Sequence, residues 1–316
     1  MARKQQTLPR DFLTLLERGD LSQLKSVFDR CEIDARDRDT KRTALAFDLC
    51  PDALTRWLVS RGADLGATDT WGNTPLHVRA GTRRGQIDVL LELGADVHAS
   101  RASIGTPLHA AASSKNVINA AKLLARGARV DAKDREGLTP LEVALQGCTN
   151  ADLEPMLELA KVLLDAGASR TPAARGYVET IGKRFEFMRA RIHPEWVERL
   201  SRALNGLYAL FEVAPVPTRT MHDGRSPIRT TARTWQAQHQ ELWSLLVPPT
   251  GPAATVQGEV IRISGRIGHE LLDNGGLNWG PEFRKMGRAF LAHLRSGNAL
   301  SAPELARARA IVEGLR

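Results

Sequence analysis

Hydrophobic positions along residues 37–169 fall into short helical runs that polar turns separate. Each pair of runs begins just after a threonine, and successive threonines are 31, 32 and 33 residues apart, at Thr43, Thr74, Thr106 and Thr139. Each pair ends near a Gly-Ala dipeptide, as in SRGADLGA (60–67) and ELGADVHA (92–99). Threonine caps helix starts, proline fits the first turn, and glycine supplies the left-handed conformation after a helix end. The pattern predicts helix, turn, helix and loop, repeated four times.

Such helix pairs have to stack, because a single pair cannot bury its own apolar face. The repeated text resembles the ankyrin repeat, with its Thr-Pro-Leu-His-x-Ala signature and a period near 33. The similarity is strongest in residues 67–99 and 100–132, and it covers about 11–170. It implies an all-α solenoid of about four repeats plus a degenerate N-terminal cap, which we expect within residues 16–37.

Two repeats depart from the signature. In residues 133–169, Glu142 replaces the usual histidine, and about seven extra residues occur, which we expect in GCTNADLEPM between the two helices. Residues 37–66 carry RTALAF where Thr-Pro-Leu-His is typical. In the two regular repeats, the resemblance implies that His77 and His109 hydrogen-bond neighbouring turns and are structural.

The ankyrin resemblance also implies where a partner would bind, namely the turn tips and the exposed side of the first helices. On this sequence the candidate partner-binding residues are Trp71, Asn73, Arg79, Ser103, Arg135 and Leu138. An exposed tryptophan is a typical interface anchor, although Trp71 could instead lie flat on the next repeat. Arg79 stands where the family has a small alanine, and the sequence favours a solvated side chain over an anion-binding one.

After Ala168 the repeats stop, and the chain continues with further predicted helices. We expect an ankyrin-repeat domain at 11–170, a helical pair that caps the stack at 171–213, a linker or ordered loop at 214–229 and a C-terminal helical domain at 230–316. Within this last domain, helices are predicted at 230–246, 254–273, 281–295 and 302–315. The C-terminal half is similar to tails of some bacterial ankyrin-repeat proteins of unassigned role, which implies no activity.

A polar stripe on the predicted helix 254–273 is the main chemical feature of this half. Its residues, with two from the following loop, form a possible polar groove: Glu259, Arg262, Arg266, Glu270, Asn278 and Trp279. The alternatives are a salt-bridged solvent face and a groove in which the arginines meet an acidic ligand. HELLD at 269–273 lacks the second histidine of a helical zinc site, so we predict no metal and no cofactor.

Composition and charge narrow the function classes. Cys31, Cys50 and Cys148 are too scattered for a disulfide framework or a zinc cluster, and we expect them in the core. Residues 1–170 hold 24 Lys and Arg against 23 Asp and Glu, whereas 171–316 hold 20 against 13. This basicity suits an acidic partner, but it is spread over several helices without interleaved aromatics, which argues against nucleic acid. No apolar run could span a membrane or serve as a signal peptide, so a cytoplasmic location is expected.

No phosphate-binding loop, nucleophile elbow or recognisable Cys/His pair occurs in the sequence. The favoured hypothesis is therefore a non-enzymatic protein whose ankyrin stack binds another protein, with an immunity or antitoxin-like protein and a secreted effector as specific forms. The alternative is a C-terminal domain that is an enzyme, or a binder of small ligands or nucleic acid, to which the stack recruits a substrate.

Overall fold

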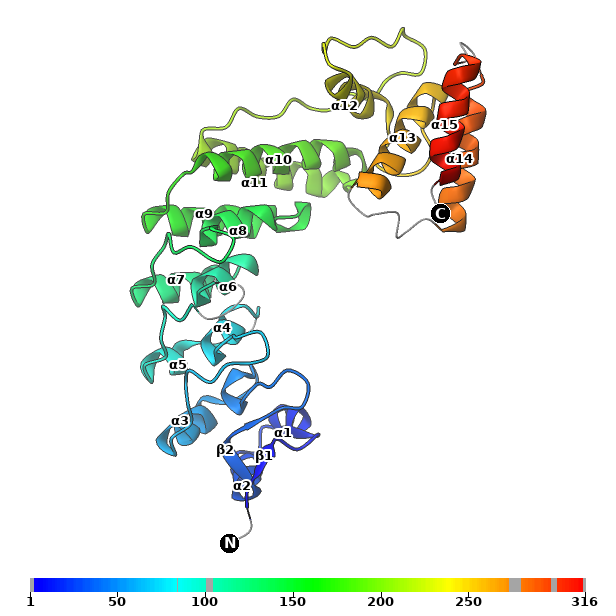
Figure 1. The fold of residues 1–316 in the computed structure, drawn as a ribbon. Coiled ribbons are helices and arrows are strands. Elements are labelled where there is room, and N and C mark those ends of the chain that lie inside the picture. Colours follow the sequence, from blue (N-terminus) through cyan, green and yellow to red (C-terminus); the bar gives the residue numbers. More distant parts are fainter. Residues whose placement is uncertain (1–2, 84, 101–104, 273–279, 297–299, 315–316) are drawn as a thin grey trace. The chain divides into compact units, whose positions relative to one another are not determined.

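The computed structural model describes residues 3–83, 85–100, 105–272, 280–296 and 300–314 (Figure 1). The chain divides into two compact units. Unit 1 comprises residues 1–185 and 194–216, and unit 2 comprises residues 186–193 and 217–316. The described residues are mostly helical, in agreement with the predicted fold class.

Unit 1 begins with a helix pair that two short strands accompany. Helices α1 (Phe12–Arg18) and α2 (Leu21–Arg30) are joined at Gly19, whose φ of 71° ends α1. Strand β1 (Gln5–Thr7) pairs in parallel with β2 (Cys31–Arg36), and these strands are an addition to the predicted all-α fold. Phe12 and Phe28 meet edge to face at 6.3 Å in the core beneath them.

Four repeat units follow, and Figure 1 shows them as successive layers. In chain order their elements are η1 (Ala44–Ala46) with α3 (Asp52–Ser60), α4 (Pro75–Ala80) with α5 (Asp88–Glu92), α6 (Pro107–Ser113) with α7 (Val117–Ala125), and α8 (Pro140–Gln146) with η2 (Asn150–Asp152) and α9 (Leu153–Asp165). The first helices pack on one another through α4, α6 and α8, while α7 packs on α9. This arrangement confirms the predicted helix-turn-helix repeat.

The glycines behave as the sequence predicts. Gly94 and Gly127 follow the second helices of their repeats with φ of 88° and 82°, and Gly62 and Gly167 are also left-handed. An L-residue with a side chain would be strained there, so these glycines set where each second helix stops.

The first repeat differs from the prediction. Its first helix is reduced to the single 3₁₀ turn η1, because only three residues separate Thr43 from Phe47, where the backbone returns to an extended conformation. The chain then turns again before Pro51, at the start of α3. The short turn leaves the first repeat with fewer internal hydrogen bonds than a full helix would supply.

The extra residues of the fourth repeat are shared between the connection and the second helix. Six residues separate α8 from α9, against three between α6 and α7, and α9 has 13 residues where α7 has nine. Helix α10 (Pro172–Met188) follows, and α11 (Pro194–Phe211) packs on α9. Gly206 permits this packing, since a Cβ there would lie 2.7 Å from Leu157.

Unit 2 is a smaller helical assembly. It contains η3 (Arg189–Arg191), α12 (Trp235–Leu246), α13 (Val256–Leu272), α14 (Pro281–His293) and α15 (Ala302–Gly314). Helix α13 packs on both α12 and α14, and its buried Ile263 and Ile267 form a core with Val312 of α15. All four helices lie close to their predicted positions.

Candidate protein-binding surface and the residues that support it

The two motif histidines link consecutive repeats. His77 Nδ1 accepts the Thr74 amide at 3.2 Å, and its Nε2 donates to the Gly105 carbonyl of the next turn at 3.0 Å. His109 repeats this arrangement, with 3.0 Å from the Thr106 amide and 3.1 Å to the Leu138 carbonyl. Burial lowers the pKa of both imidazoles, which keeps them in the neutral form that this hydrogen-bond pattern requires. Both histidines are structural, as predicted.

Glu142 occupies the same motif position in the fourth repeat, but it accepts a hydrogen bond from the following segment where the histidines donate one. Its Oε2 accepts the Thr139 amide at 2.7 Å, which completes a capping box, and its Oε1 accepts the Thr171 hydroxyl at 2.6 Å. The Thr171 Oγ1 in turn accepts the Ala174 amide in the first turn of α10. Burial alone raises the pKa of Glu142, but the hydrogen bonds from Thr171 and Thr139 outweigh it and lower that pKa to about 2. The replacement thus suits a neighbour that offers a donor instead of a carbonyl.

Arg79 is not solvated, and the prediction that it is exposed for a partner is wrong. Its side chain is fully buried, with 0% exposure. Nε donates to the Leu45 carbonyl at 2.8 Å, and Nη2 donates to Thr55 Oγ1 at 3.2 Å, with longer contacts from the guanidinium to the carbonyls of Cys50 and Gln86. Burial lowers the pKa of this guanidinium. Arg79 therefore connects α4 to the irregular first repeat, whose η1 turn supplies the accepting Leu45 carbonyl.

Trp71 lies at the tip of the turn that precedes α4 and is 52% exposed. The Arg42 guanidinium, from the preceding turn, lies 5.8 Å from its ring centroid. Residues 101–104, which include the candidate Ser103, lie outside the described residues. Trp71 consequently presents a large ring to solvent at the place where the ankyrin resemblance puts partner contacts.

A buried carboxylate holds this turn in one conformation. Asp69 Oδ1 accepts the amides of Trp71 and Asn73 at 2.9 and 2.8 Å, and Oδ2 accepts from Asn73 Nδ2 at 3.2 Å. Arg42 Nε also reaches Oδ2 at 3.5 Å. These hydrogen bonds fix the conformation of the turn within the chain itself.

The remaining candidates divide into exposed and supporting residues. Arg135 is exposed, and no hydrogen bond or ion pair involves it within the described part of the chain. Leu138 is half-buried, and its amide donates to Asp134 while its carbonyl accepts from His109. Asn73 is likewise tied to its own turn, so both support the tips more than they present a surface.

Arg42 is a surface residue that the sequence reasoning missed. It stands immediately before Thr43, at the repeat position that Asn73 and Leu138 occupy before their own threonines. Alignment of the four repeats on their threonines gives this equivalence, but the contact with Trp71 requires two successive turns to be adjacent in space.

The polar stripe of α13 contains one closed ion pair and one open arginine. Arg262 Nε donates to Glu259 Oε2 at 2.8 Å, and a second bond joins the guanidinium to Oε1. Glu259 also accepts the Ala253 amide at 2.9 Å. Arg266 is exposed, one turn further along α13, and has no such partner among the described residues. The side chain of Glu270 lies outside the described residues, as do Asn278 and Trp279.

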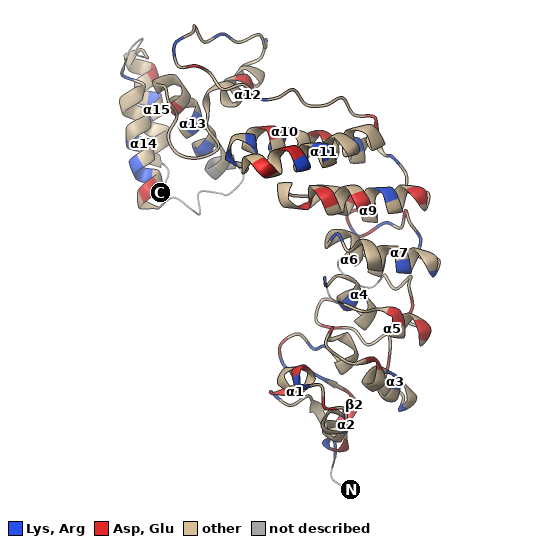
Figure 2. Cartoon of the chain, turned by 180° about the vertical axis from the view of Figure 1, so that it is seen from behind, with Lys and Arg blue, Asp and Glu red and all other residues tan. Residues whose placement is uncertain are grey.

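The described residues contain no cluster of metal-ligating side chains, and residues of both charges are mixed along the helices (Figure 2). No group of three or more His, Cys, Asp or Glu side chains there could hold a metal ion, and the three cysteines are buried and free. Basic and acidic residues are interspersed along the helices of both units (Figure 2). Over the same described residues, no helix is long and apolar enough to cross a membrane.

Comparisons with known proteins agree with this geometry. Residues 42–134 match the family model of ankyrin repeats, in three copies. The chain is 35% identical to human Rabankyrin-5 over 89 residues, which are 28% of this chain and 8% of that protein. It is 32% identical over 133 residues to the putative ankyrin repeat protein FPV031 of fowlpox virus, which is 39% of this chain and 38% of that protein.

The chain therefore contains ankyrin repeats, a type of module that generally mediates contacts between proteins. The matched segments span well under two thirds of either relative.

Proposed function

We propose that this chain is a non-enzymatic protein-binding module whose ankyrin stack holds a protein partner through the turn tips around Trp71. The observation that carries the proposal is a tryptophan that is 52% exposed on a turn fixed by a buried aspartate. Large aromatic side chains of this kind supply most of the binding energy in many interfaces, provided that the partner covers them fully.

Arg42 extends the same surface. Its guanidinium faces the Trp71 ring at 5.8 Å, so the two side chains form one flat, cationic and aromatic patch. Arg135 adds a second exposed guanidinium at a later turn tip. A partner segment with an apolar residue flanked by carboxylates has the complementary chemistry.

We further propose that the helical pair 171–213 closes the open end of the stack. The supporting contacts are the Thr171 to Glu142 hydrogen bond and the packing of α11 on α9. A solenoid needs such a cap because its last repeat otherwise exposes an apolar face.

The test begins with chemical crosslinking of the full chain in its own cells and identification of the crosslinked peptides. The purified partner is then titrated against the wild-type chain, Trp71→Ala and the matched control Trp235→Ala, which removes a tryptophan that is 72% exposed on α12, outside the stack. We expect Trp71→Ala to weaken binding about 30-fold or more, and the control to stay within about twofold. Equal affinities for the wild-type chain and Trp71→Ala would refute the assignment of the surface.

A further inference from the structure

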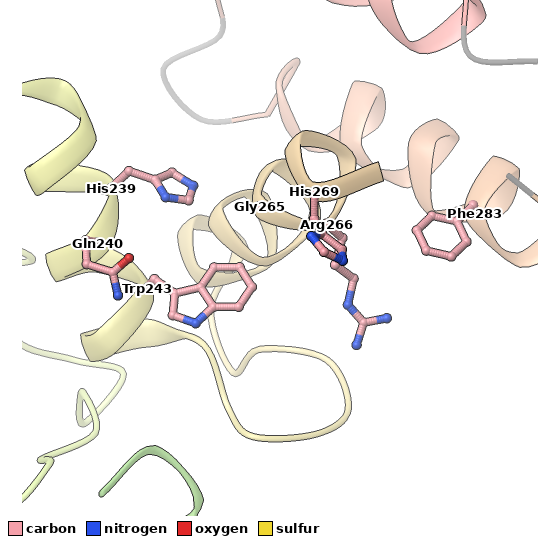
Figure 3. A pocket seen from close by; sticks show the side chains of 7 residues that line it. All are labelled: His239, Gln240, Trp243, Gly265, Arg266, His269 and Phe283. Atoms are coloured by element: carbon pink, nitrogen blue, oxygen red, sulfur yellow. The ribbon is translucent and has the colours of Figure 1, made fainter. Parts of the chain in front are cut away.

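A cavity in unit 2 is lined by side chains from three helices. Its volume is about 560 Å³, and its lining residues are His239, Gln240, Trp243, Gly265, Arg266, His269 and Phe283. Figure 3 shows the first three on α12, the next three on α13 and Phe283 on α14. Cavities that hold small molecules measure roughly 300 to 1,000 Å³ and combine apolar walls with a few polar groups, as this one does.

The wall between α12 and α13 is closely fitted. A Cβ at Gly265 would lie 2.3 Å from the Trp243 ring, so the indole rests directly on the backbone of α13. His239 Nε2 is 3.1 Å from Ser264 Oγ, whose hydroxyl donates to the Ile261 carbonyl at 2.9 Å, so the imidazole is the donor to the hydroxyl. The rings of His239 and Trp243 are therefore held in place, with their centroids 6.2 Å apart.

Charge distinguishes this cavity from the rest of the α13 stripe. Among the described residues that line it, Arg266 is the only arginine or lysine, and no carboxylate is present. Arg262, one turn earlier, has its charge matched by Glu259 through two hydrogen bonds. Arg266 has no comparable carboxylate within the described part of unit 2. A guanidinium beside an aromatic wall attracts an anion that also carries a flat ring.

We propose that this cavity binds a planar aromatic anion of nucleotide size or smaller, with its ring on Trp243 and its carboxylate or phosphate on Arg266. Stacking on Trp243 stabilises the bound ring, and a charge-assisted bidentate hydrogen bond from Arg266 stabilises the bound anion. Both parts are needed, because neither the exposed guanidinium nor the ring surface alone provides much affinity in water. The proposal is independent of the protein-binding surface around Trp71.

The experiment uses the full chain, with ligand-observed NMR to detect binding and calorimetry to measure Kd. Two probes combine a ring with an anion, adenosine monophosphate for the phosphate source and indole-3-acetate for the carboxylate source. Adenosine, indole, inorganic phosphate and acetate test the parts separately. We expect one of the two combined probes to bind with a Kd of about 1 mM or tighter, and its separate parts to bind about tenfold more weakly or not at all.

Variants assign the binding to the cavity. Arg266→Gln removes the charge at an exposed position, and Arg307→Gln makes the same change at an exposed position of α15, away from the cavity. Arg266→Gln is expected to weaken binding of the combined probe about tenfold, and Arg307→Gln is expected to leave its Kd unchanged. The proposal is overturned if neither combined probe binds, if phosphate or acetate alone binds as tightly, or if both variants behave like the wild-type chain.

Discussion

Replacement of Arg79 by methionine is expected to loosen the contact between the first and second repeats. Methionine fills a similar volume but donates no hydrogen bond. The change leaves the buried Leu45 carbonyl and the Thr55 hydroxyl without their donors at 2.8 and 3.2 Å, and it also removes two contacts at 3.4 and 3.5 Å. Hydrogen bonds to a charged donor are worth about 1.5 to 3 kcal/mol each, so the two shorter ones total about 3 to 6 kcal/mol.

Two effects reduce the loss of stability in the variant. A buried guanidinium carries a desolvation cost that methionine does not, and the methionine side chain gains apolar contacts. We therefore expect a net destabilisation of about 2 to 4 kcal/mol. Arg79→Lys is expected to lose most of the same stability, because one ammonium cannot reach acceptors on three sides as the planar guanidinium does.

Hydrogen exchange is the appropriate assay, since a chain with two compact units has no single defined free energy of unfolding. In Arg79→Met, amides in residues 44–60 and 75–92 should exchange about 30-fold faster or more, while residues 256–272 keep their wild-type rates. Arg83→Met is the matched control, because Arg83 is exposed four residues further on. A loss below about 1 kcal/mol, or an equal effect of the control, would refute the reasoning.

Two further predictions concern the pH dependence of unit 1. Hydrogen bonds hold the folded pKa of Glu142 near 2, below the ordinary value of 4.5, so its contribution of about 3 kcal/mol to stability is complete above pH 4.5 and lost as the pH falls towards 2. In Glu142→Gln, hydrogen exchange over residues 140–175 should depend less on pH in this acid range. An unchanged pH dependence contradicts the assignment. Burial lowers the pKa of His77 and His109, so the unfolded chain binds more protons below about pH 6.5 and the stack loses stability there. His109→Gln should remove part of this loss, measured as hydrogen exchange in residues 107–125. Identical exchange profiles of the variant and the wild-type chain above pH 5 would contradict the prediction.

The sequence predicted the periodic part of the fold well, because its signals are local. Threonine spacing set the phase of the repeats, and the glycines at 94 and 127 marked helix ends through their own backbone conformation. The length of the first helix in repeat one was overestimated, since an apolar run alone does not show that the chain turns extended again at Phe47.

The site residues were harder to predict, because their roles depend on distant neighbours. Arg79 has the hydropathy of a surface residue, and its burial depends on a carbonyl 34 residues earlier, in an element that is itself irregular. The contact of Arg42 with Trp71 needs two turns side by side, and the cavity at Trp243 needs three helices. The periodicity of the sequence carries no information about such contacts between distant segments.

The hydrogen bond from Thr171 to Glu142 also bears on how the array ends. His77 and His109 each donate a hydrogen bond to a carbonyl of the following turn, which is what a regular next repeat offers. Glu142 instead presents a hydrogen-bond acceptor to the segment that follows, and a carbonyl at the position of the Thr171 hydroxyl would be repelled by it. A regular repeat placed directly after the fourth would bring its carbonyl against this acceptor, so Glu142 is unfavourable for a further repeat at this end of the stack.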